Sequence, residues 1–166
     1  MAQSNFNDLE ALKIAIQIER RGEVFYEKSM YLAPNDSVSQ MLAELAEQER
    51  DHAATFQEIY NELSQHKQNF DDEYLYNPEV SAYLRAMVET SVFPSDELQE
   101  EIMRDIKDTT DVLAIGIQAE KDSILFYTEM IINARYIEAK DAFRRLLKEE
   151  KKHLIDLQTQ LNEYKK

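Results

Sequence analysis

Six side chains of the kinds that bind metal ions form one pattern that occurs twice in this sequence. In the first copy, Glu19 is followed thirty residues later by Glu49-x-x-His52. Each member recurs 101 residues further along the chain, as Glu120, Glu150 and His153. The i, i+3 spacing of Glu-x-x-His places both side chains on one face of a helix, so the glutamate can bridge two metals while the histidine binds one. The pattern predicts a site for two metal ions, built by two copies of one helical hairpin.

The charge of this ligand set supports the same interpretation. Four carboxylates buried together in a helical core would be very costly unless a cation or bound protons neutralise them. Two divalent ions carry four positive charges, and the two imidazoles are neutral ligands, so the set is balanced. Oxygen and nitrogen ligands of this kind accept iron, manganese or zinc.

The elements that position these residues are predicted to be helices throughout. The chain has only two glycines and three prolines, which favours an all-α fold. Asn7 to Glu10 resembles a capping box, Ser37 and Gln40 suggest a second one, and Thr109 or Thr110 would cap a third helix. The predicted elements are long helices over 8–33, 37–66, 109–134 and 137–164, a loop over 67–78, and short helices over 79–93 and after Ser95.

Hairpin geometry tests this arrangement, because two residues face each other across antiparallel helices only if they are equidistant from the turn. The midpoint between Glu19 and Glu49 is Pro34, and the midpoint between Glu120 and Glu150 is Arg135. Both glutamates of each pair then lie roughly 22 Å from their turn. Apolar residues at steps of three and four share the ligands' face, so the site is predicted to interrupt a core stripe at one level.

Composition limits the remaining possibilities. With 166 residues and 43% hydrophobic content, we expect one domain spanning 1–166. The absence of cysteine excludes disulfides and thiolate metal sites. A net charge of −14 disfavours nucleic acid and anionic membranes as partners. No apolar run approaches membrane-spanning length and no signal segment is evident, which predicts a soluble cytoplasmic protein.

The doubled motif resembles that of the ferritin-like superfamily, in particular rubrerythrin-like and bacterioferritin-like di-iron carboxylate proteins, over about 8–66 and 110–164. The resemblance implies an antiparallel four-helix bundle made of two duplicated hairpins, with short helices in the connection. It also implies that Glu49 and Glu150 bridge the metals. The terminal ligands would be Glu19 and His52 for one metal, and Glu120 and His153 for the other.

Tyr26 and Tyr127 lie two turns after their glutamates and resemble the tyrosine that accompanies the ligands in this superfamily. Each could hydrogen-bond a ligand carboxylate or supply an electron, or could simply pack in the core. The sequence departs from rubrerythrins at Ser123, where they carry an additional glutamate, and in lacking the cysteine-ligated rubredoxin domain. The long connection could cover the site or form a subunit interface.

The resemblance implies a non-haem di-iron oxidoreductase that reduces hydrogen peroxide or dioxygen as it oxidises Fe(II), acting as a peroxidase in oxidative stress. Electrons would come from an external donor such as a rubredoxin-like protein, and we expect a homodimer. The alternative is a ferroxidase that stores or delivers iron, which would assemble as a large cage. Oxidation of an organic substrate is a third possibility and would require a sizeable pocket beside the metals.

Overall fold

The chain is described by a computed structural model over residues 5–66 and 75–166. Four long helices and two short ones make up the described part of the chain. They are α1 (Asp8–Ser29), α2 (Asp36–Gln65), α3 (Pro78–Glu89), α4 (Asp96–Asp105), α5 (Thr109–Asn133) and α6 (Ile137–Tyr164), with a 3-10 turn, η1 (Met30–Leu32), after α1. The expected all-α fold is confirmed.

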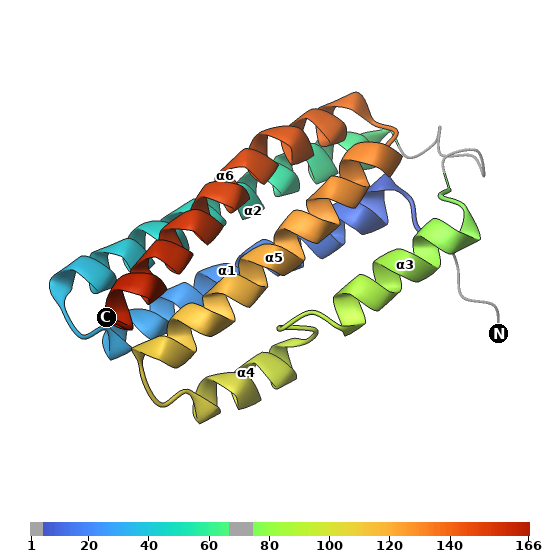
Figure 1. Cartoon of the computed structure of the whole chain (residues 1–166). Helices are drawn as coiled ribbons and strands as arrows, with labels where there is room; N and C mark the ends of the chain where they lie inside the picture. The colour runs from blue at the N-terminus through green and yellow to red at the C-terminus, as the bar shows by residue number, and fades with distance from the viewer. Residues whose placement is uncertain (1–4, 67–74) are drawn as a thin grey trace.

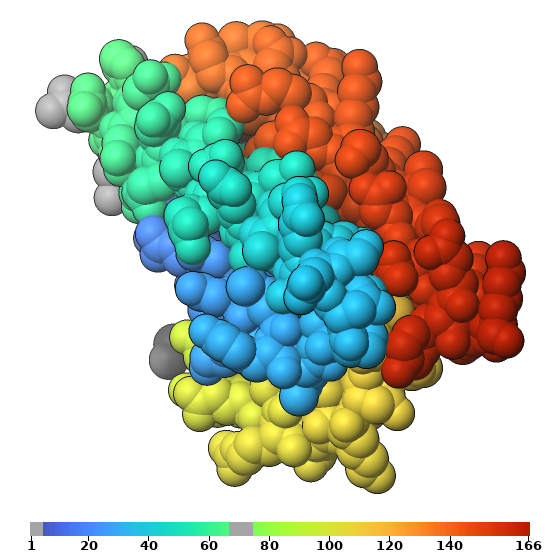
Figure 2. Space-filling model, turned by 90° about the vertical axis from the view of Figure 1, so that its left-hand side faces the viewer, coloured from blue at the N-terminus to red at the C-terminus, as the bar shows by residue number. Residues whose placement is uncertain are grey.

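The long helices pair as two antiparallel hairpins, α1 with α2 and α5 with α6. The turn of the first hairpin and the turn of the second lie at opposite ends of the bundle (Figure 1). The connection therefore runs the full length of the bundle, with α3 packed against α5 and α4 against α1. Turned by 90°, the molecule shows α2 and α6 on one side and the connection on the other, next to α1 (Figure 2).

Two apolar clusters fill the core, one toward each end of the bundle. The cluster near the α5–α6 turn contains Phe56, Phe126 and Phe143, and the ring of Phe143 pairs with each of the other two. The cluster near the α1–α2 turn contains Phe25 and Phe93, with ring centroids 5.2 Å apart. Along each long helix, the predicted metal ligands lie between these two clusters.

Each hairpin is also tied to the turn of the other at its first helical residue. The buried carboxylate of Asp8 accepts hydrogen bonds from the backbone N–H groups of Arg135 and Tyr136 and from the Tyr76 hydroxyl. At the equivalent position of the second hairpin, the Thr109 hydroxyl donates to the carbonyl of Leu32. These contacts fix the relative position of the hairpins, and hence of the two halves of the site.

Several predicted boundaries agree with the structure, including the whole of α6 and the turn at Arg135. The predicted cap Ser37 is wrong, because Asn35 accepts from Val38 N and starts α2 one residue earlier. Thr109 and Thr110 were likewise wrong as caps, since Asp108 accepts from Asp111 N.

The other differences concern helix ends. The helix predicted over 79–93 ends at Glu89, where the Thr90 and Ser91 hydroxyls bond back to carbonyls of its last turn. The last residues of the helix predicted over 8–33 form η1 instead. Most of the predicted loop, 67–74, lies outside the described residues. In the described part, no helix is long and apolar enough to cross a membrane.

Candidate metal centre

The six residues of the doubled motif converge on one level of the bundle core. None is more than 3% exposed: Glu19, Glu49, His52, Glu120, Glu150 and His153. They form two overlapping groups, in each of which one possible ligand atom per residue lies within 4.8 Å of the others. The first group consists of Glu19, Glu49, His52 and Glu150, and the second of Glu49, Glu120, Glu150 and His153. Glu49 and Glu150 belong to both.

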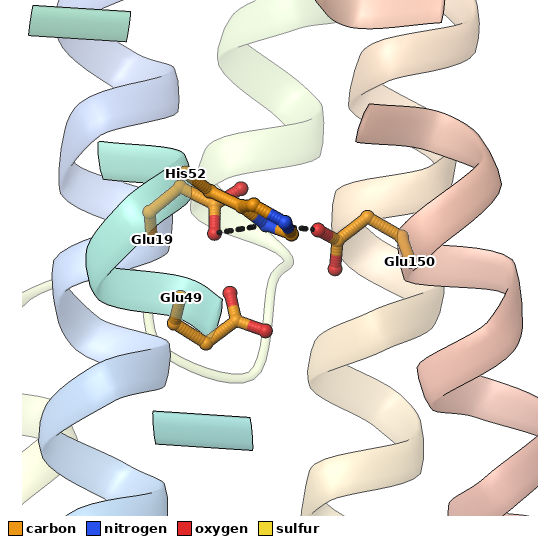
Figure 3. A group of neighbouring side chains, drawn as sticks. All are labelled: Glu19, Glu49, His52 and Glu150. Carbon is orange, nitrogen blue, oxygen red and sulfur yellow. Dashed lines mark ion pairs between the residues drawn. The ribbon is translucent and has the colours of Figure 1, made fainter. Parts of the chain in front are cut away.

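The first group combines side chains from three helices (Figure 3). Glu19 projects from α1 and Glu150 from α6, while Glu49 and His52 come from consecutive turns of α2. The Nδ1 atom of His52 lies 2.7 Å from Glu150 Oε1 and 3.3 Å from Glu19 Oε2. This nitrogen points into the space that the carboxylates surround.

The second histidine is placed in the same way. The Nδ1 atom of His153 lies 3.2 Å from Glu49 Oε1, 3.6 Å from Glu120 Oε2 and 3.5 Å from Glu150 Oε2. The two imidazole rings stack nearly parallel, with centroids 5.7 Å apart. One imidazole nitrogen and three carboxylates therefore surround each of two adjacent positions.

The outer nitrogen of each histidine is held by a residue of the opposite hairpin. His52 Nε2 lies 2.8 Å from Glu149 Oε2, and His153 Nε2 lies 2.6 Å from Gln48 Oε1. Because both partners are acceptors, each Nε2 carries the hydrogen and donates it. The lone pair of each neutral imidazole is then on Nδ1, the nitrogen that faces the carboxylates, as a metal ligand requires.

The residues present fit a pair of metal ions. Within the part of the chain that the structure describes, seven buried atoms at this level lack a hydrogen-bond partner: both carboxylate oxygens of Glu19 and Glu150, Oε1 of Glu49, and Nδ1 of His52 and His153. Buried polar atoms are otherwise nearly always paired. Acceptor atoms gathered in this way around a common centre are the arrangement that a cation satisfies.

The same crowding changes the acidity of the carboxylates. Burial, reinforced by the charges of Glu49 and Glu150, raises the pKa of Glu19 and of Glu120 well above the usual range. In the absence of metal, this shift favours the protonated form of both groups. A divalent ion that binds here displaces these protons.

The two histidines and Glu150 shift one another's pKa values. Burial alone lowers the pKa of His153, but its interactions with the surrounding carboxylates outweigh burial and raise that pKa to about 12. Burial also lowers the pKa of His52, but the hydrogen bond and the charge of Glu150 outweigh it, so that this pKa is raised as well. For Glu150, burial is outweighed by the two imidazoles, which hold its pKa below the usual range.

The two tyrosines differ in their contacts, although both are buried. The Tyr26 hydroxyl donates to Glu120 Oε1 at 2.5 Å, whereas the Tyr127 hydroxyl has no hydrogen-bond partner in the described structure. Gly116 makes room for Tyr26, since a Cβ there would lie 3.3 Å from the ring. The residue equivalent to Gly116 in the first hairpin is Ala15, so this feature is not duplicated.

A small cavity adjoins the ligands on the side of the connection. It has a volume of about 40 Å³, and Glu49, Glu120 and Tyr26 form part of its wall. The segment 88–93 of the connection contributes Val88, Ser91, Val92 and Phe93 to the same wall. The connection therefore lies beside the site, as the role of covering it requires.

Two polar contacts hold the segment 88–93 in place. Val92 N donates to the carboxylate of Asp122 at 2.7 Å, and the Arg21 guanidinium donates to the carbonyl of Phe93 at 3.3 Å. Asp122 is half-buried, which raises its pKa, while the bond from Val92 works in the opposite direction. The segment is thus attached to both α1 and α5, the helices that flank the cavity.

Other residues near the motif do not join the two groups. Ser123 is buried and donates to the carbonyl of Ala119. Glu23 pairs with Arg50 at 2.7 Å. Sequence reasoning missed Gln48 and Glu149, although the signal was available, because these residues are also 101 apart and each directly precedes a glutamate of the motif.

Comparison with known proteins places this geometry in context. The family model described as Rubrerythrin matches residues 10–161. A crystal structure from Thermotoga maritima, described as a ferritin-like diiron-carboxylate protein, is 29% identical with a TM-score of 0.73, over 98% of this chain and 99% of that one. A hypothetical protein from Pyrococcus furiosus is 19% identical with a TM-score of 0.65, over 95% and 89% of the two chains, and supports the fold alone. Among curated proteins there is no significant match.

Proposed function

This chain belongs to the rubrerythrin family, and from that premise we propose that it binds two iron ions and uses them to reduce hydrogen peroxide. The observation that carries the proposal is the pair of overlapping groups of buried carboxylates and imidazoles. A centre of two redox-active ions matches a reaction that needs two electrons at once. Manganese or zinc would fit the same ligands, and the experiment below separates these cases from iron.

The overlap of the groups supports a role for each residue. Glu49 and Glu150 belong to both groups, so we assign them as the bridging ligands. Glu19 with His52 and Glu120 with His153 would be the terminal ligands of the first and second ion. Tyr26 holds Glu120 by its short hydrogen bond and is assigned as a positioning residue. For Tyr127, core packing against Phe56 and Phe143 is the assignment that its contacts favour.

Two bound ferrous ions would supply the two electrons that, with two protons, convert one hydrogen peroxide molecule into two water molecules and leave the ions ferric. The protein contributes a buried ligand set, in which no ligand is more than 3% exposed. The cavity of about 40 Å³ has room for a few water-sized molecules and not for a sizeable organic substrate. Its size favours peroxide or dioxygen over the third possibility, oxidation of an organic molecule.

The electrons that restore the ferrous state would come from another protein. The chain contains no cysteine, and therefore no thiolate-bound redox group of its own. We propose a rubredoxin-like donor. We also propose that the protein works as a homodimer, for which the measurement is solution mass.

The test is anaerobic loading with two Fe(II) per chain, followed by stopped-flow mixing with hydrogen peroxide or with dioxygen. We expect peroxide to oxidise both ions faster than dioxygen does, with iron remaining at two ions per chain. Glu23→Gln is the matched control, because Glu23 lies on α1 with Glu19 but outside both groups. The rate of iron oxidation in this variant should be unchanged.

Two other results would contradict the peroxidase proposal. Faster oxidation by dioxygen, with iron accumulating far beyond two ions per chain in a large assembly, would favour the ferroxidase alternative. If neither oxidant oxidises the iron, and zinc or manganese is retained in its place, the redox proposal is wrong.

A further inference from the structure

We propose that the two metal positions are unequal, and that Glu149 makes the position served by His52 bind a divalent ion more tightly than the position served by His153. The inference rests on the metal site of the proposed function but not on its redox reaction. It depends on two differences between residues that are equivalent by the 101-residue repeat.

The first difference is the partner of each histidine. Gln48 and Glu149 occupy equivalent positions, and each reaches across to the histidine of the opposite hairpin. His52 therefore donates its Nε2 hydrogen to a carboxylate, whereas His153 donates to a neutral amide oxygen. A carboxylate acceptor makes the stronger hydrogen bond and increases the electron density on the other ring nitrogen. His52 is thus the better ligand.

The second difference concerns the carboxylates that we assign as terminal ligands. Glu120 accepts a hydrogen bond of 2.5 Å from Tyr26, which withdraws electron density from a ligand of the His153 position. Tyr127 makes no hydrogen bond, and both oxygens of Glu19 are without a partner in the described structure. Glu19 can give its full basicity to the ion at the His52 position. Both differences therefore act in the same direction.

The size of the effect follows from the exposure of Glu149. Changes to residues that hold a metal-binding histidine alter affinity by about 10- to 100-fold. The Glu149 side chain is 47% exposed, so solvent screens part of its charge. We expect the lower end of that range, a ratio of about tenfold between the two stepwise binding constants.

The test is anaerobic calorimetric titration of the metal-free protein with Co(II), with the visible absorption of bound cobalt as a second readout. The wild-type chain should bind two ions in two steps. Glu149→Gln should weaken the first step and leave the second nearly unchanged. The matched variant Gln48→Glu should strengthen the second step. Each variant gives both histidines the same type of partner, so the two steps should move closer together.

Single-site variants identify which position fills first. His153→Ala should retain the tighter step and His52→Ala the weaker one. Two equal steps in the wild-type chain would overturn the proposal, and so would equal weakening of both steps by Glu149→Gln. Because Co(II) is not oxidised in this experiment, unequal binding with no peroxide reaction would leave the inference standing and refute only the proposed function.

Discussion

The two hairpins contribute the same ligands to the centre but surround them with different residues. In the first hairpin, Gly22 lies beside Glu49, and a Cβ there would approach its carboxylate to 3.3 Å; the equivalent residue of the second hairpin is Ser123. One tyrosine holds a carboxylate and its counterpart does not. The comparison teaches that duplication preserves the atoms that a metal needs, while the residues behind them are free to diverge.

Removing the ligands that both positions share should have the largest effect. We expect Glu49→Ala combined with Glu150→Ala to abolish binding of two ions per chain, a loss well beyond the roughly 100-fold upper range for residues behind the ligands. Metal analysis and calorimetry give the stoichiometry.

The control for this double variant is a measurement that it still folds without metal. The metal-free variant should still unfold cooperatively as a helical bundle, because the two apolar clusters of the core are unchanged. Unchanged stoichiometry would show that the ions are held elsewhere.

The contacts at the ends of the bundle should come next. Asp8→Ala removes the acceptor for two backbone N–H groups and the Tyr76 hydroxyl, all at least partly buried, and should lower the free energy of unfolding by about 3 kcal/mol. Thr109→Ala removes one bond to Leu32 and should cost about 1 kcal/mol. Urea unfolding of the metal-free proteins measures both free energies. Equal losses in the two variants would contradict the prediction that the Asp8 contacts stabilise the fold more than the Thr109 contact does.

The tyrosines provide a closer comparison within the core. Tyr26→Phe deprives the buried Glu120 of its hydrogen-bond donor and should cost about 2 kcal/mol. Tyr127→Phe removes a hydroxyl that has no partner in the described structure, so its stability should be unchanged or slightly increased. If the two variants lose the same free energy of unfolding, the hydrogen bond to Glu120 contributes nothing to the fold.

The last prediction compares the two histidines through the pH dependence of stability. The unfolded value for histidine is 6.5 and the folded pKa of His153 is about 12, so between these values the folded chain holds the additional proton. Metal-free stability should therefore fall as pH rises from 7, by at most about 1.4 kcal/mol per pH unit for this proton. His153→Gln should reduce the slope more than His52→Gln does, since the pKa of His52 is shifted less. Thermal melts from pH 7 to 10 measure these slopes.

Much of this architecture could be predicted from the sequence because it depends on periodicity. The turn at Arg135 was placed without any glycine or proline, from the repeat and from equidistance alone, and α6 has the predicted bounds. The helix caps could not be placed in the same way. Asn35, Asp36 and Ser37 are all good capping residues in succession, so tertiary packing decides which of them is used.

The 101-residue repeat pairs residues around the ligands, but it does not show what those residues contact. Gln48 and Glu149 resemble ordinary polar residues of a helix surface, and only the packing of α2 against α6 brings each to the opposite histidine. Likewise, the segment 88–93 reaches the cavity wall only through its contacts with α1 and α5. Contacts between elements far apart in the sequence leave no periodic signal.

The placement of the two turns at opposite ends gives the bundle an approximate twofold axis across its length. An axis of this kind also relates two identical hairpins that pair as a symmetric dimer. Two copies of the first hairpin alone would supply four glutamates and two histidines, the same ligands as the whole chain. Joining the halves in one polypeptide allows something that such a dimer cannot have: a glutamine beside one histidine and a glutamate beside the other.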